Sequence, residues 1–402
     1  MVDDPLAPVL QFCLSALLVL AFQKPPPSRS CSSSSSTPSI ISTAYSRQIG
    51  STPLIKLSNL SSFLPPSCAI FLKLESHNPG GTGKDRIALG MLNSVLASLE
   101  PHQHLDSIFE GTSGSTGISL ATLCAPLNVE CTVCVPDDQS PTKFAQIESV
   151  GGKVHVVPTS SISSPSHYVN VARRLAEERQ AKLDKQGGGG VSVFMDQFNN
   201  LANFRTHFTT TGPEILQQMS DRKAPISAFV MSAGTGGTVA GVGNYLCQQQ
   251  SPPPRIVLAD PPGSVFHGTV TTGVAYTQEQ KEATIRKHRY DTICEGIGLD
   301  RVTGNFKRHN CCDSVKVTDQ QVVDMAHFVL RTEGLQIGSS TACNLVAALH
   351  EAKRGGGGNV VTVMCDQGKN HIQRLWNREF IEGKGLVWPG AQVEWEKWLE
   401  TL

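Results

Sequence analysis

The sequence predicts an α/β protein built on mostly parallel β-sheets. Short segments rich in β-branched residues alternate with helical segments at the spacing of βαβ units, and glycine-rich turns separate several of them. Parallel strands joined by helices bury both faces of each sheet, so three layers are expected. With 402 residues the chain can bury a large core, and we expect two such three-layer domains.

The expected elements follow one another along the chain. A strand at Ala69–Leu74 leads through the turn Asn78-Pro79-Gly80-Gly81 into a helix that begins near Lys84. Later strands are expected at Ser107–Gly111, Val129–Val135, Val154–Val157, Val191–Met195, Ala228–Met231, Arg255–Ala259 and Val360–Met364. Later helices are expected at Ile118–Cys124, Pro141–Val150, His167–Lys185, Leu201–Met219, Val239–Gln249, Gln320–Glu333 and Thr341–Lys353.

Composition narrows the class of partner. Lysine plus arginine equals aspartate plus glutamate, 34 each, so net charge does not favour nucleic acid or an anionic membrane. Small-molecule partners are therefore favoured. The 12 cysteines are scattered along a long chain, which indicates reduced thiols, and no set of them has the spacing of a metal site.

Lys84 stands where the first long helix is expected to begin. The N-terminus of a helix is positive, so a lysine there does not stabilise the helix. An amine beside glycines that allow close approach suits a nucleophile that forms a Schiff base with a carbonyl cofactor. A surface lysine in a glycine-rich turn would be the better interpretation if this stretch stood alone.

Two loops rich in glycine and hydroxyl groups follow strands and open helices. Ser232–Thr238 reads S-A-G-T-G-G-T and lacks the lysine of a triphosphate-binding loop, so its amides at a helix N-terminus favour a monophosphate. Glu110–Gly117 reads E-G-T-S-G-S-T-G and offers amides and hydroxyls that suit a carboxylate. An ordinary helix cap is the alternative for the second loop. Both loops lie where parallel sheets bind ligands, outside the carboxyl ends of the strands.

A third loop, Gln336–Thr341, carries Ser339 at the start of a helix rich in small residues. A serine hydroxyl beside a pyridine nitrogen leaves that ring unprotonated, which favours rapid expulsion of a β-leaving group. A helix-capping serine would look the same, so only the combination of motifs distinguishes the two interpretations.

Four motifs occur in one order: N-P-G-G-T-G-K-D-R from Asn78, T-S-G-S-T-G from Thr112, G-T-G-G-T from Gly234 and G-S-S-T from Gly338. With them, from about Ser51 to about Trp376, the chain resembles the cysteine synthase and cystathionine β-synthase family, in a divergent, fungal-type branch. The resemblance implies fold type II of the pyridoxal phosphate enzymes, pyridoxal 5′-phosphate as cofactor, and a homodimer.

The resemblance also implies a role for each motif residue. Lys84 would hold the cofactor covalently and later take the α-proton of the substrate. The phosphate would be held by Gly234, Thr235, Gly236, Gly237 and Thr238, and the ring nitrogen would face Ser339. The substrate carboxylate would be held by Thr112, Ser113, Gly114, Thr116 and Gln197. Ser115 stands where the family usually has an asparagine that contacts the 3′ oxygen of the cofactor, so this contact is lost or bridged by water.

The activity implied is β-replacement, in which O-acetyl-L-serine and hydrogen sulfide give L-cysteine and acetate in a ping-pong cycle. A cystathionine β-synthase or serine sulfhydrase reaction, or a serine dehydratase, is the alternative within the same chemistry. A non-catalytic protein that binds a partner at a membrane is the alternative of another class, although the presence of Lys84 argues against it.

The ends of the chain are expected to lie outside the two domains. The apolar run Val9–Phe22 is followed by basic residues and resembles the signal anchors of mitochondrial outer-membrane proteins, which leave the enzyme facing the cytosol. An anchor for another membrane, or a disordered start in a cytoplasmic protein, is the alternative. Residues 1–43 thus comprise this segment and a Ser/Pro-rich linker.

The domain boundaries follow from the same motifs. Residues 44–72 and 191–386 are expected to form the large, cofactor-binding domain, and 73–190 the small domain that binds the substrate carboxylate. The apolar tail 387–402, together with Trp376, is expected to take part in a dimer contact.

Overall fold

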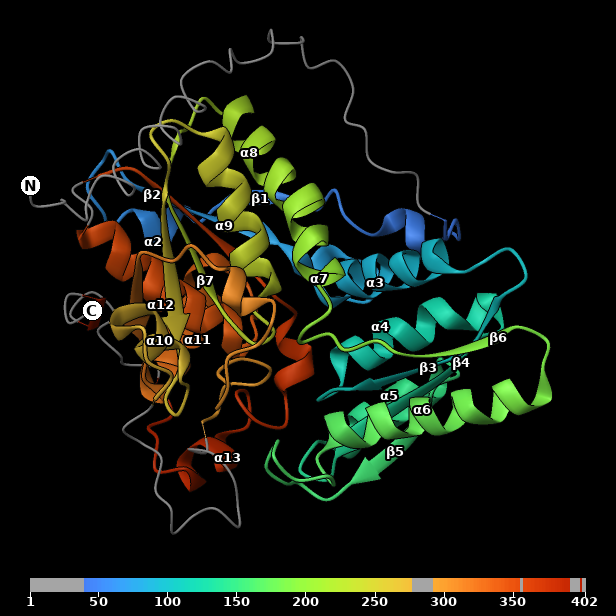
Figure 1. Cartoon of the computed structure of the whole chain (residues 1–402). Coiled ribbons are helices and arrows are strands. Elements are labelled where there is room, and N and C mark those ends of the chain that lie inside the picture. The colour runs from blue at the N-terminus through green and yellow to red at the C-terminus, as the bar shows by residue number, and fades with distance from the viewer. Residues whose placement is uncertain (1–39, 277–291, 355–356, 391–397, 400–402) are drawn as a thin grey trace, which may run out of the picture. The chain divides into compact units, whose positions relative to one another are not determined.

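A computed structural model describes residues 40–276, 292–354, 357–390 and 398–399. Two separate β-sheets organise the described part of the chain from Ile40 onward (Figure 1). The predicted α/β class with mostly parallel sheets is confirmed. Each sheet lies between helices, as buried faces on both sides of a parallel sheet require.

The larger sheet has six strands in the order β1-β2-β10-β7-β8-β9. Its strands are β1 (Leu54–Lys56), β2 (Ala69–Leu74), β7 (Ile226–Ser232), β8 (Arg255–Asp260), β9 (Asp313–Lys316) and β10 (Asn359–Met364). Only the pairing of β1 with β2 is antiparallel, and the other pairings are parallel. The carboxyl ends of β2, β10 and β7 therefore meet at one edge of the sheet.

The smaller sheet has four parallel strands in the order β5-β4-β3-β6. They are β3 (His104–Gly111), β4 (Glu130–Pro136), β5 (Lys153–Val157) and β6 (Gly190–Phe194). Cys131 and Cys134 of β4 lie in different hydrophobic clusters, as expected for side chains three residues apart on a strand. Neither cysteine is placed to form a redox pair with the other.

Helices complete the layers around both sheets. The described helices are α2 (Ser58–Ser61), α3 (Lys84–Ser98), α4 (Ser115–Cys124), α5 (Pro141–Ser149), α6 (Tyr168–Gln186), α7 (Ala202–Thr206), α8 (Gly212–Asp221), α9 (Gly237–Gln249), α10 (Phe266–Thr272), α11 (Asp319–Glu333), α12 (Ser339–Arg354) and α13 (Arg378–Gly383). Helices α8 and α9 cover one face of the six-stranded sheet, and α11 and α12 cover the other. In the smaller sheet, α6 covers one face, while α3, α4 and α5 cover the opposite face.

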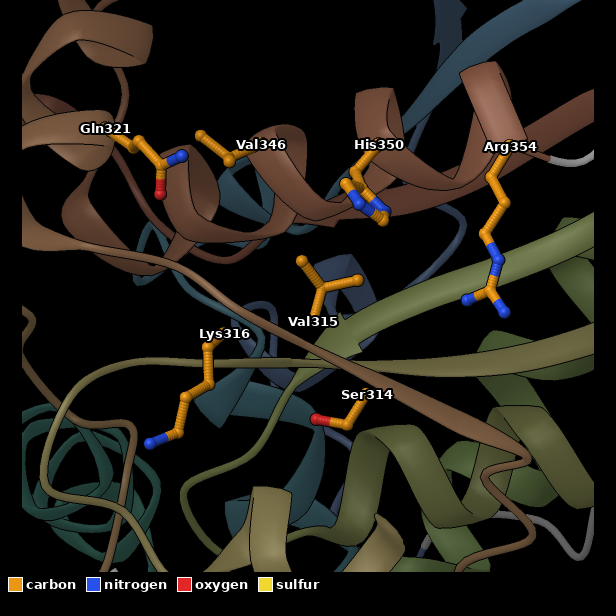
Figure 2. A pocket seen from close by; sticks show the side chains of 7 residues that line it. All are labelled: Ser314, Val315, Lys316, Gln321, Val346, His350 and Arg354. Atoms are coloured by element: carbon orange, nitrogen blue, oxygen red, sulfur yellow. The ribbon is translucent and has the colours of Figure 1, made fainter. Parts of the chain in front are cut away.

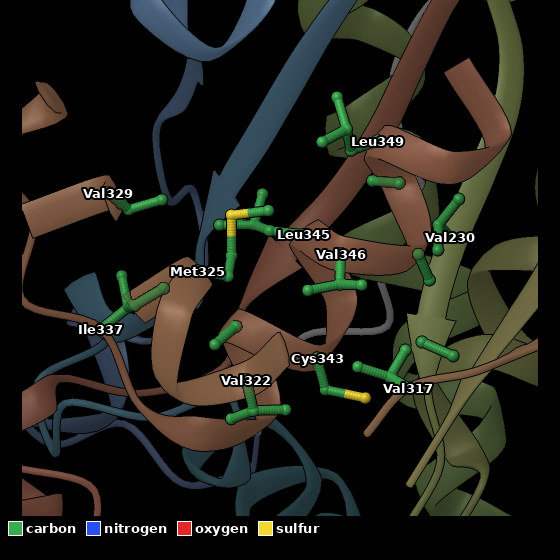
Figure 3. Close-up of a cluster of buried hydrophobic side chains, with 14 of the residues drawn as sticks. Val230, Val317, Val322, Met325, Val329, Ile337, Cys343, Leu345, Val346 and Leu349 are labelled. Atoms are coloured by element: carbon green, nitrogen blue, oxygen red, sulfur yellow. The ribbon is translucent and has the colours of Figure 1, made fainter. Parts of the chain in front are cut away.

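The apolar core beneath α11 and α12 holds the larger sheet in place (Figure 3). Val230 of β7 lies in this core with Val322 and Met325 of α11 and Leu345 and Leu349 of α12, all of them fully buried. Burying each such side chain contributes about 1.5–3 kcal/mol, so this core fixes the strand ends that carry the loops of the site.

Three expected features differ from the structure. The segment predicted as one helix, Leu201–Met219, is divided into α7 and α8 by a π-helical turn at His207–Thr211. The short strands β1 and β9 and the helices α2, α10 and α13 were not predicted. The two expected boundaries between the large and the small domain fall inside strands, because residue 73 lies in β2 and residue 191 lies in β6. The division into domains stays a prediction.

Two predictions concern the ends of the chain, a membrane anchor and a dimer contact. The apolar run at 9–22, expected to be an anchor, lies outside the described residues. In the part of the chain that is described, no helix has both the length and the apolar character needed to cross a bilayer. Trp376 and the described tail residues Trp388, Trp398 and Leu399 pack against the chain's own hydrophobic core. A role of these residues in a dimer contact stays a prediction.

Candidate active site

Lys84 and the glycine-rich loop at Ser232–Thr238 emerge from strands that are almost neighbours. Lys84 follows β2, the loop follows β7, and β10 lies between these two strands with parallel pairing on both sides. Two interstrand spacings separate β2 from β7, which is about 10 Å. Lys84 and the glycine-rich loop therefore lie at the same edge of the sheet.

Lys84 is the first residue of α3, as expected. The turn before it is fixed by Asp85, whose carboxylate accepts hydrogen bonds from the Gly80 amide at 2.6 Å and from Ser119 Oγ at 2.6 Å. The Gly83 amide donates to the carbonyl of Cys365, at the end of β10. These contacts hold the start of α3 between α4 and β10.

Lys84 is half-buried at the start of α3. Burial lowers its pKa below the usual lysine range, and the nearby Cys365 and Asp366 oppose this shift by a smaller amount. A lysine with a lowered pKa is neutral in a larger fraction of molecules near pH 7, and only the neutral amine is a nucleophile or a base. This environment fits the chemistry predicted for Lys84.

The loop between β7 and α9 has the geometry of an anion cradle. Gly236 has a φ of 84°, and a Cβ atom at this position would lie 2.6 Å from Phe306 Cα. A side chain at Gly234 or Gly237 would collide with the carbonyl of Gly296 or the amide of Asn203. Glycines thus allow the chain to turn directly into α9, whose first N–H groups have no partner within the helix.

Buried polar atoms beside this loop fit an anionic ligand. Asn203 Nδ2 donates to Thr235 Oγ1 at 2.9 Å. Among the described residues, the buried hydroxyl of Ser232 has no hydrogen-bond partner, and a hydroxyl can donate to an anion. The glycine turn, the helix N-terminus and these polar atoms together fit the phosphate group of a cofactor.

His207 was not predicted as a site residue, and the structure shows that it contacts the glycine loop. It lies in the π-helical turn, where its ring nitrogens lie 3.1 Å from Thr238 Oγ1 and 2.9 Å from Thr211 Oγ1. Burial, opposed by the charge of Glu75 and assisted by the charges of Arg86 and Lys84, lowers the pKa of His207 to about 3. The imidazole is therefore neutral and supports Thr238. In the sequence, His207 is a single histidine inside a predicted helix, and this pattern does not by itself indicate a functional residue.

Ser339 is fully buried at the start of α12. Its Oγ accepts a hydrogen bond from the backbone N–H of Glu295 at 3.1 Å, which leaves the hydroxyl proton for an acceptor elsewhere. In the same turn, Thr341 Oγ1 accepts from the Cys365 amide at 3.1 Å. The third predicted loop thus also lies at the end of β10, beside the segment that contacts Gly83.

The carboxylate loop follows β3 in the smaller sheet. Thr116 Oγ1 donates to Gln197 Oε1 at 2.7 Å, and Gln197 Nε2 donates to the carbonyl of Gly111 at 3.1 Å. Thr112, Gly114, Thr116 and Gln197 are buried, whereas Ser113 and Ser115 are half-buried. Gln197 therefore fixes this loop from the segment that follows β6.

Two short chains of contacts connect the carboxylate loop to the rest of the site. The Gln197 carbonyl accepts from Asn203 Nδ2, which also donates to Thr235 of the glycine loop. Ser119 Oγ donates to Asp85 beside Lys84 at 2.6 Å and lies 3.1 Å from the carbonyl of Ser115. The structure thus brings all four predicted loops to one place.

A separate groove lies away from these residues. Its volume is about 240 Å³, and it lies between β9, α11 and α12 (Figure 2). Its lining includes Lys316, Gln321, His350 and Arg354, and none of the predicted site residues. The groove therefore does not coincide with the candidate active site.

These features define a class of protein. Parallel sheets that bring a lysine with a lowered pKa and a phosphate-type glycine loop to one edge are the framework of an α/β enzyme with a phosphorylated cofactor. The chain belongs to the pyridoxal-phosphate dependent enzyme family, whose model matches residues 45–366. Fold type II is thereby confirmed, and pyridoxal 5′-phosphate is the cofactor of this family.

Relatives extend this assignment. The chain is 43% identical over 336 residues to a Saccharomyces cerevisiae protein named "Putative mitochondrial cysteine synthase", with 82% of each chain covered. It is 40% identical over 344 residues to cysteine synthase 2 of Schizosaccharomyces pombe, with 84% of this chain and 85% of that protein covered. The solved structure of an O-acetylserine dependent cystathionine β-synthase from Helicobacter pylori has a TM-score of 0.67 and 27% identity, covering 83% of this chain and 98% of the other.

Proposed function

We propose that the protein makes L-cysteine from O-acetyl-L-serine and hydrogen sulfide, with release of acetate. The observation that carries the proposal is the meeting of Lys84, the glycine loop and Ser339 at the ends of neighbouring strands. The names of the relatives support it, because two of them are cysteine synthases that align over more than four fifths of the chain.

The site residues fit pyridoxal 5′-phosphate. The amides of Gly234, Gly236 and Gly237, with Thr235 and Thr238, would hold its phosphate at the N-terminus of α9. When bound, the cofactor supplies a reactive aldehyde and an electron-withdrawing ring, which makes the α-proton of an attached amino acid acidic. Lys84 would hold the cofactor, and Ser115 would lie on the side of the site next to Asp85.

Two residues would act on protons. Lys84 Nζ, with its pKa lowered by burial, would accept the α-proton of the substrate as a neutral amine. Ser339 Oγ already accepts the Glu295 amide, so its hydroxyl proton is free to be donated to the ring nitrogen. A hydroxyl cannot protonate that nitrogen, and the weaker electron withdrawal that results favours β-elimination.

The carboxylate loop would bind the amino acid. Amides and hydroxyls of Thr112, Ser113, Gly114 and Thr116 would hold the substrate carboxylate, with Gln197 fixing the loop. The Cβ–O bond of the substrate breaks and acetate leaves. Sulfide then forms the new C–S bond at the same carbon, and a proton returns to Cα.

One second candidate has a specific observation in its favour. The similar structure from H. pylori is titled as an O-acetylserine dependent cystathionine β-synthase, so the thiol substrate could be homocysteine. Serine in place of O-acetylserine, serine dehydration without a thiol, and a non-catalytic binding role stay as further alternatives, and the cysteine synthase names of the two relatives favour them less.

One set of assays tests the proposal. Purified full-length protein, loaded with pyridoxal 5′-phosphate, is given O-acetylserine or serine, each with sulfide, with homocysteine or with no thiol. We expect cysteine and acetate from O-acetylserine with sulfide at the highest kcat/KM. Faster formation of cystathionine, or of pyruvate without thiol, would favour an alternative, and an inert protein with no visible cofactor absorbance would overturn the proposal.

We also propose a mitochondrial location and a homodimer. The name of the S. cerevisiae relative supports the location, and the apolar run at 9–22 supports the finer proposal of an outer-membrane anchor facing the cytosol. Carbonate extraction of purified mitochondria tests the anchor, because an anchored protein stays in the membrane pellet and a variant without residues 1–38 does not. Analytical ultracentrifugation tests the dimer.

A further inference from the structure

An ion pair connects the smaller sheet to the larger one beside the carboxylate loop. Lys143 Nζ on α5 lies 2.7 Å from Glu295 Oε1, which belongs to the segment before β9. The two side chains are only 17% and 13% exposed. Exposed ion pairs on protein surfaces contribute little, but this one is largely withdrawn from water and joins two parts of the site.

Glu295 lies on the side of the larger sheet, and both its backbone N–H and its carboxylate make contacts there. Its backbone N–H donates to Ser339 Oγ, the hydroxyl assigned to the ring nitrogen. Its carboxylate lies 2.9 Å from His371 Nδ1, and His371 Nε2 lies 2.9 Å from Asp366. Against the effect of burial, the charge of Asp366 in turn raises the pKa of Lys84. Arg374 lies 3.9 Å from the same carboxylate. Although burial opposes ionisation, His371 and Lys143 lower the pKa of Glu295 to about 2, so its charge persists at neutral pH.

On the smaller sheet, the aliphatic part of Lys143 lies against the carboxylate loop. Gly114 has a φ of 137°, and a Cβ atom at this glycine would lie 2.9 Å from Lys143 Cδ and 3.4 Å from Lys143 Cγ. The stem of Lys143 thus occupies the space beside the Gly114 backbone. A movement of this stem would remove the support of the loop on that side.

A second contact joins the same two regions. Ser140 Oγ, at the N-cap of α5, donates to Gln373 Oε1 at 2.6 Å, and Gln373 Nε2 donates to Thr142 Oγ1 at 3.2 Å. The start of α5 therefore meets the larger sheet at two points, through Lys143 with Glu295 and through Ser140 with Gln373. We call these four residues the clasp.

We propose that Lys143 and Glu295 are positioning residues, whose ion pair couples the carboxylate loop at Gly114 to the hydroxyl of Ser339. The proposal rests on the function proposed above. Neither residue is assigned contact with the reacting atoms. When the pair is intact, the loop that holds the substrate carboxylate and the hydroxyl that faces the cofactor ring keep one relative position, which favours the productive orientation of the substrate.

Three variants of the loaded full-length enzyme test the coupling: Lys143→Met, which keeps an unbranched stem but removes the charge, Glu295→Gln, and the two changes combined. Because small misplacements of substrate are costly, each single change is expected to raise KM for O-acetylserine about 10-fold, with a smaller effect on kcat. If one shared interaction is lost, the double variant is no worse than either single variant. Effects that multiply in the double variant would overturn the coupling.

A second measurement does not depend on turnover. Amide hydrogen exchange at residues 112–117 is expected to be faster in Lys143→Met than in the wild-type protein, before any amino acid is added. Arg179→Met is the matched control, because Arg179 forms a 2.8 Å ion pair with Asp106 away from the site, and it should change neither exchange at 112–117 nor KM.

The outcomes separate the two proposals. A wild-type enzyme that converts O-acetylserine, with unchanged KM and unchanged exchange in both single variants, would refute the role of the Lys143–Glu295 ion pair and leave the proposed function intact. A wild-type protein that does not use O-acetylserine would refute the function, while faster exchange at 112–117 in Lys143→Met would still support the coupling and unchanged exchange would refute it.

Discussion

Arg86 and Glu214 form a two-point ion pair, in which the Arg86 Nη1 and Nη2 atoms lie 2.7 and 2.8 Å from the two carboxylate oxygens of Glu214. Arg86 lies two residues after Lys84 on α3, and Glu214 lies on α8. Arg86 also forms an ion pair with Glu75, and the buried Lys73 donates a hydrogen bond to Glu214 at 2.7 Å. A buried group of charges thus fixes the helix that carries Lys84.

Glu214→Gln is expected to lower the stability of the protein. It leaves Arg86 and Lys73 with less negative charge around them, and removing one partner of a largely buried pair costs about 3 kcal/mol. Urea unfolding at pH 7 measures the free energy of unfolding of both proteins. Glu178→Gln on α6 is the control, because its 3.6 Å pair with Arg174 is exposed and should change stability by about 0.5 kcal/mol or less.

The same pair predicts a dependence on pH. Burial alone would raise the pKa of Glu214, but Arg86 and Lys73 outweigh it and lower the pKa from 4.5 to about 2. A folded-state pKa below the unfolded value means that the contribution is complete above about pH 4.5 and is lost as pH falls toward about 2. The difference in stability between wild type and Glu214→Gln should therefore shrink across this window. A difference that stays constant from pH 6 to pH 2.5 would contradict the assignment.

Lys84→Ala is expected to remove covalent attachment of the cofactor and nearly all turnover. The change removes both the attachment point and the proposed base, and positioned bases contribute about 10²- to 10⁴-fold to rates. Borohydride reduction followed by peptide mass spectrometry should find the cofactor on Lys84 in the wild-type protein and on no peptide of the variant. Lys182→Ala, an exposed lysine of α6, should behave like wild type in both measurements.

Gln197→Ala is expected to weaken binding of the amino acid. Thr116 would lose its acceptor and the Gly111 carbonyl would lose its donor, and leaving a buried group unpaired costs about 1–3 kcal/mol. KM for O-acetylserine should therefore rise about 10- to 100-fold, with a smaller change in kcat. Gln180→Ala serves as the control, since Gln180 accepts a hydrogen bond from the Ser192 amide outside the site. It should leave KM unchanged even where stability falls.

Much of the fold was predictable because most strands are short segments rich in β-branched residues, a pattern that can be recognised in the sequence. The β-branched strand Val360–Met364 was predicted within one residue of β10, and a Pro residue marks the start of α5. The strands β1 and β9 have only three and four residues, and they exist because longer neighbours pair with them. The π-helical turn at His207–Thr211 continues a helical pattern, so apolar spacing could not reveal it.

The structure brings the predicted site loops together, and the roles of their residues stay predictions. Lysine and hydroxyl residues in these loops are informative because surface loops tolerate many residue types, so core packing does not account for their presence. His207, Lys143 and Glu295 were missed because each is common in its local context, and each gains its meaning from a partner far away in the chain. Contacts of this kind require the fold before they can be seen.

Gly236→Ala is expected to reduce the affinity for pyridoxal 5′-phosphate. This loss of affinity comes in addition to the loss of stability that backbone strain causes. Gly236 has a φ of 84°, so any side chain there is strained by about 1 kcal/mol, and its Cβ would also press on Phe306 at 2.6 Å. Gly334→Ala is the matched control, because Gly334 has a φ of 71° with no atom within 4 Å of a new Cβ. Both variants should lose similar stability from strain. Only Gly236→Ala should displace the amides of the glycine loop, so its dissociation constant for the cofactor, measured by equilibrium dialysis, should rise about 10-fold or more. Equal affinities in the two variants would show that this loop does not bind the phosphate.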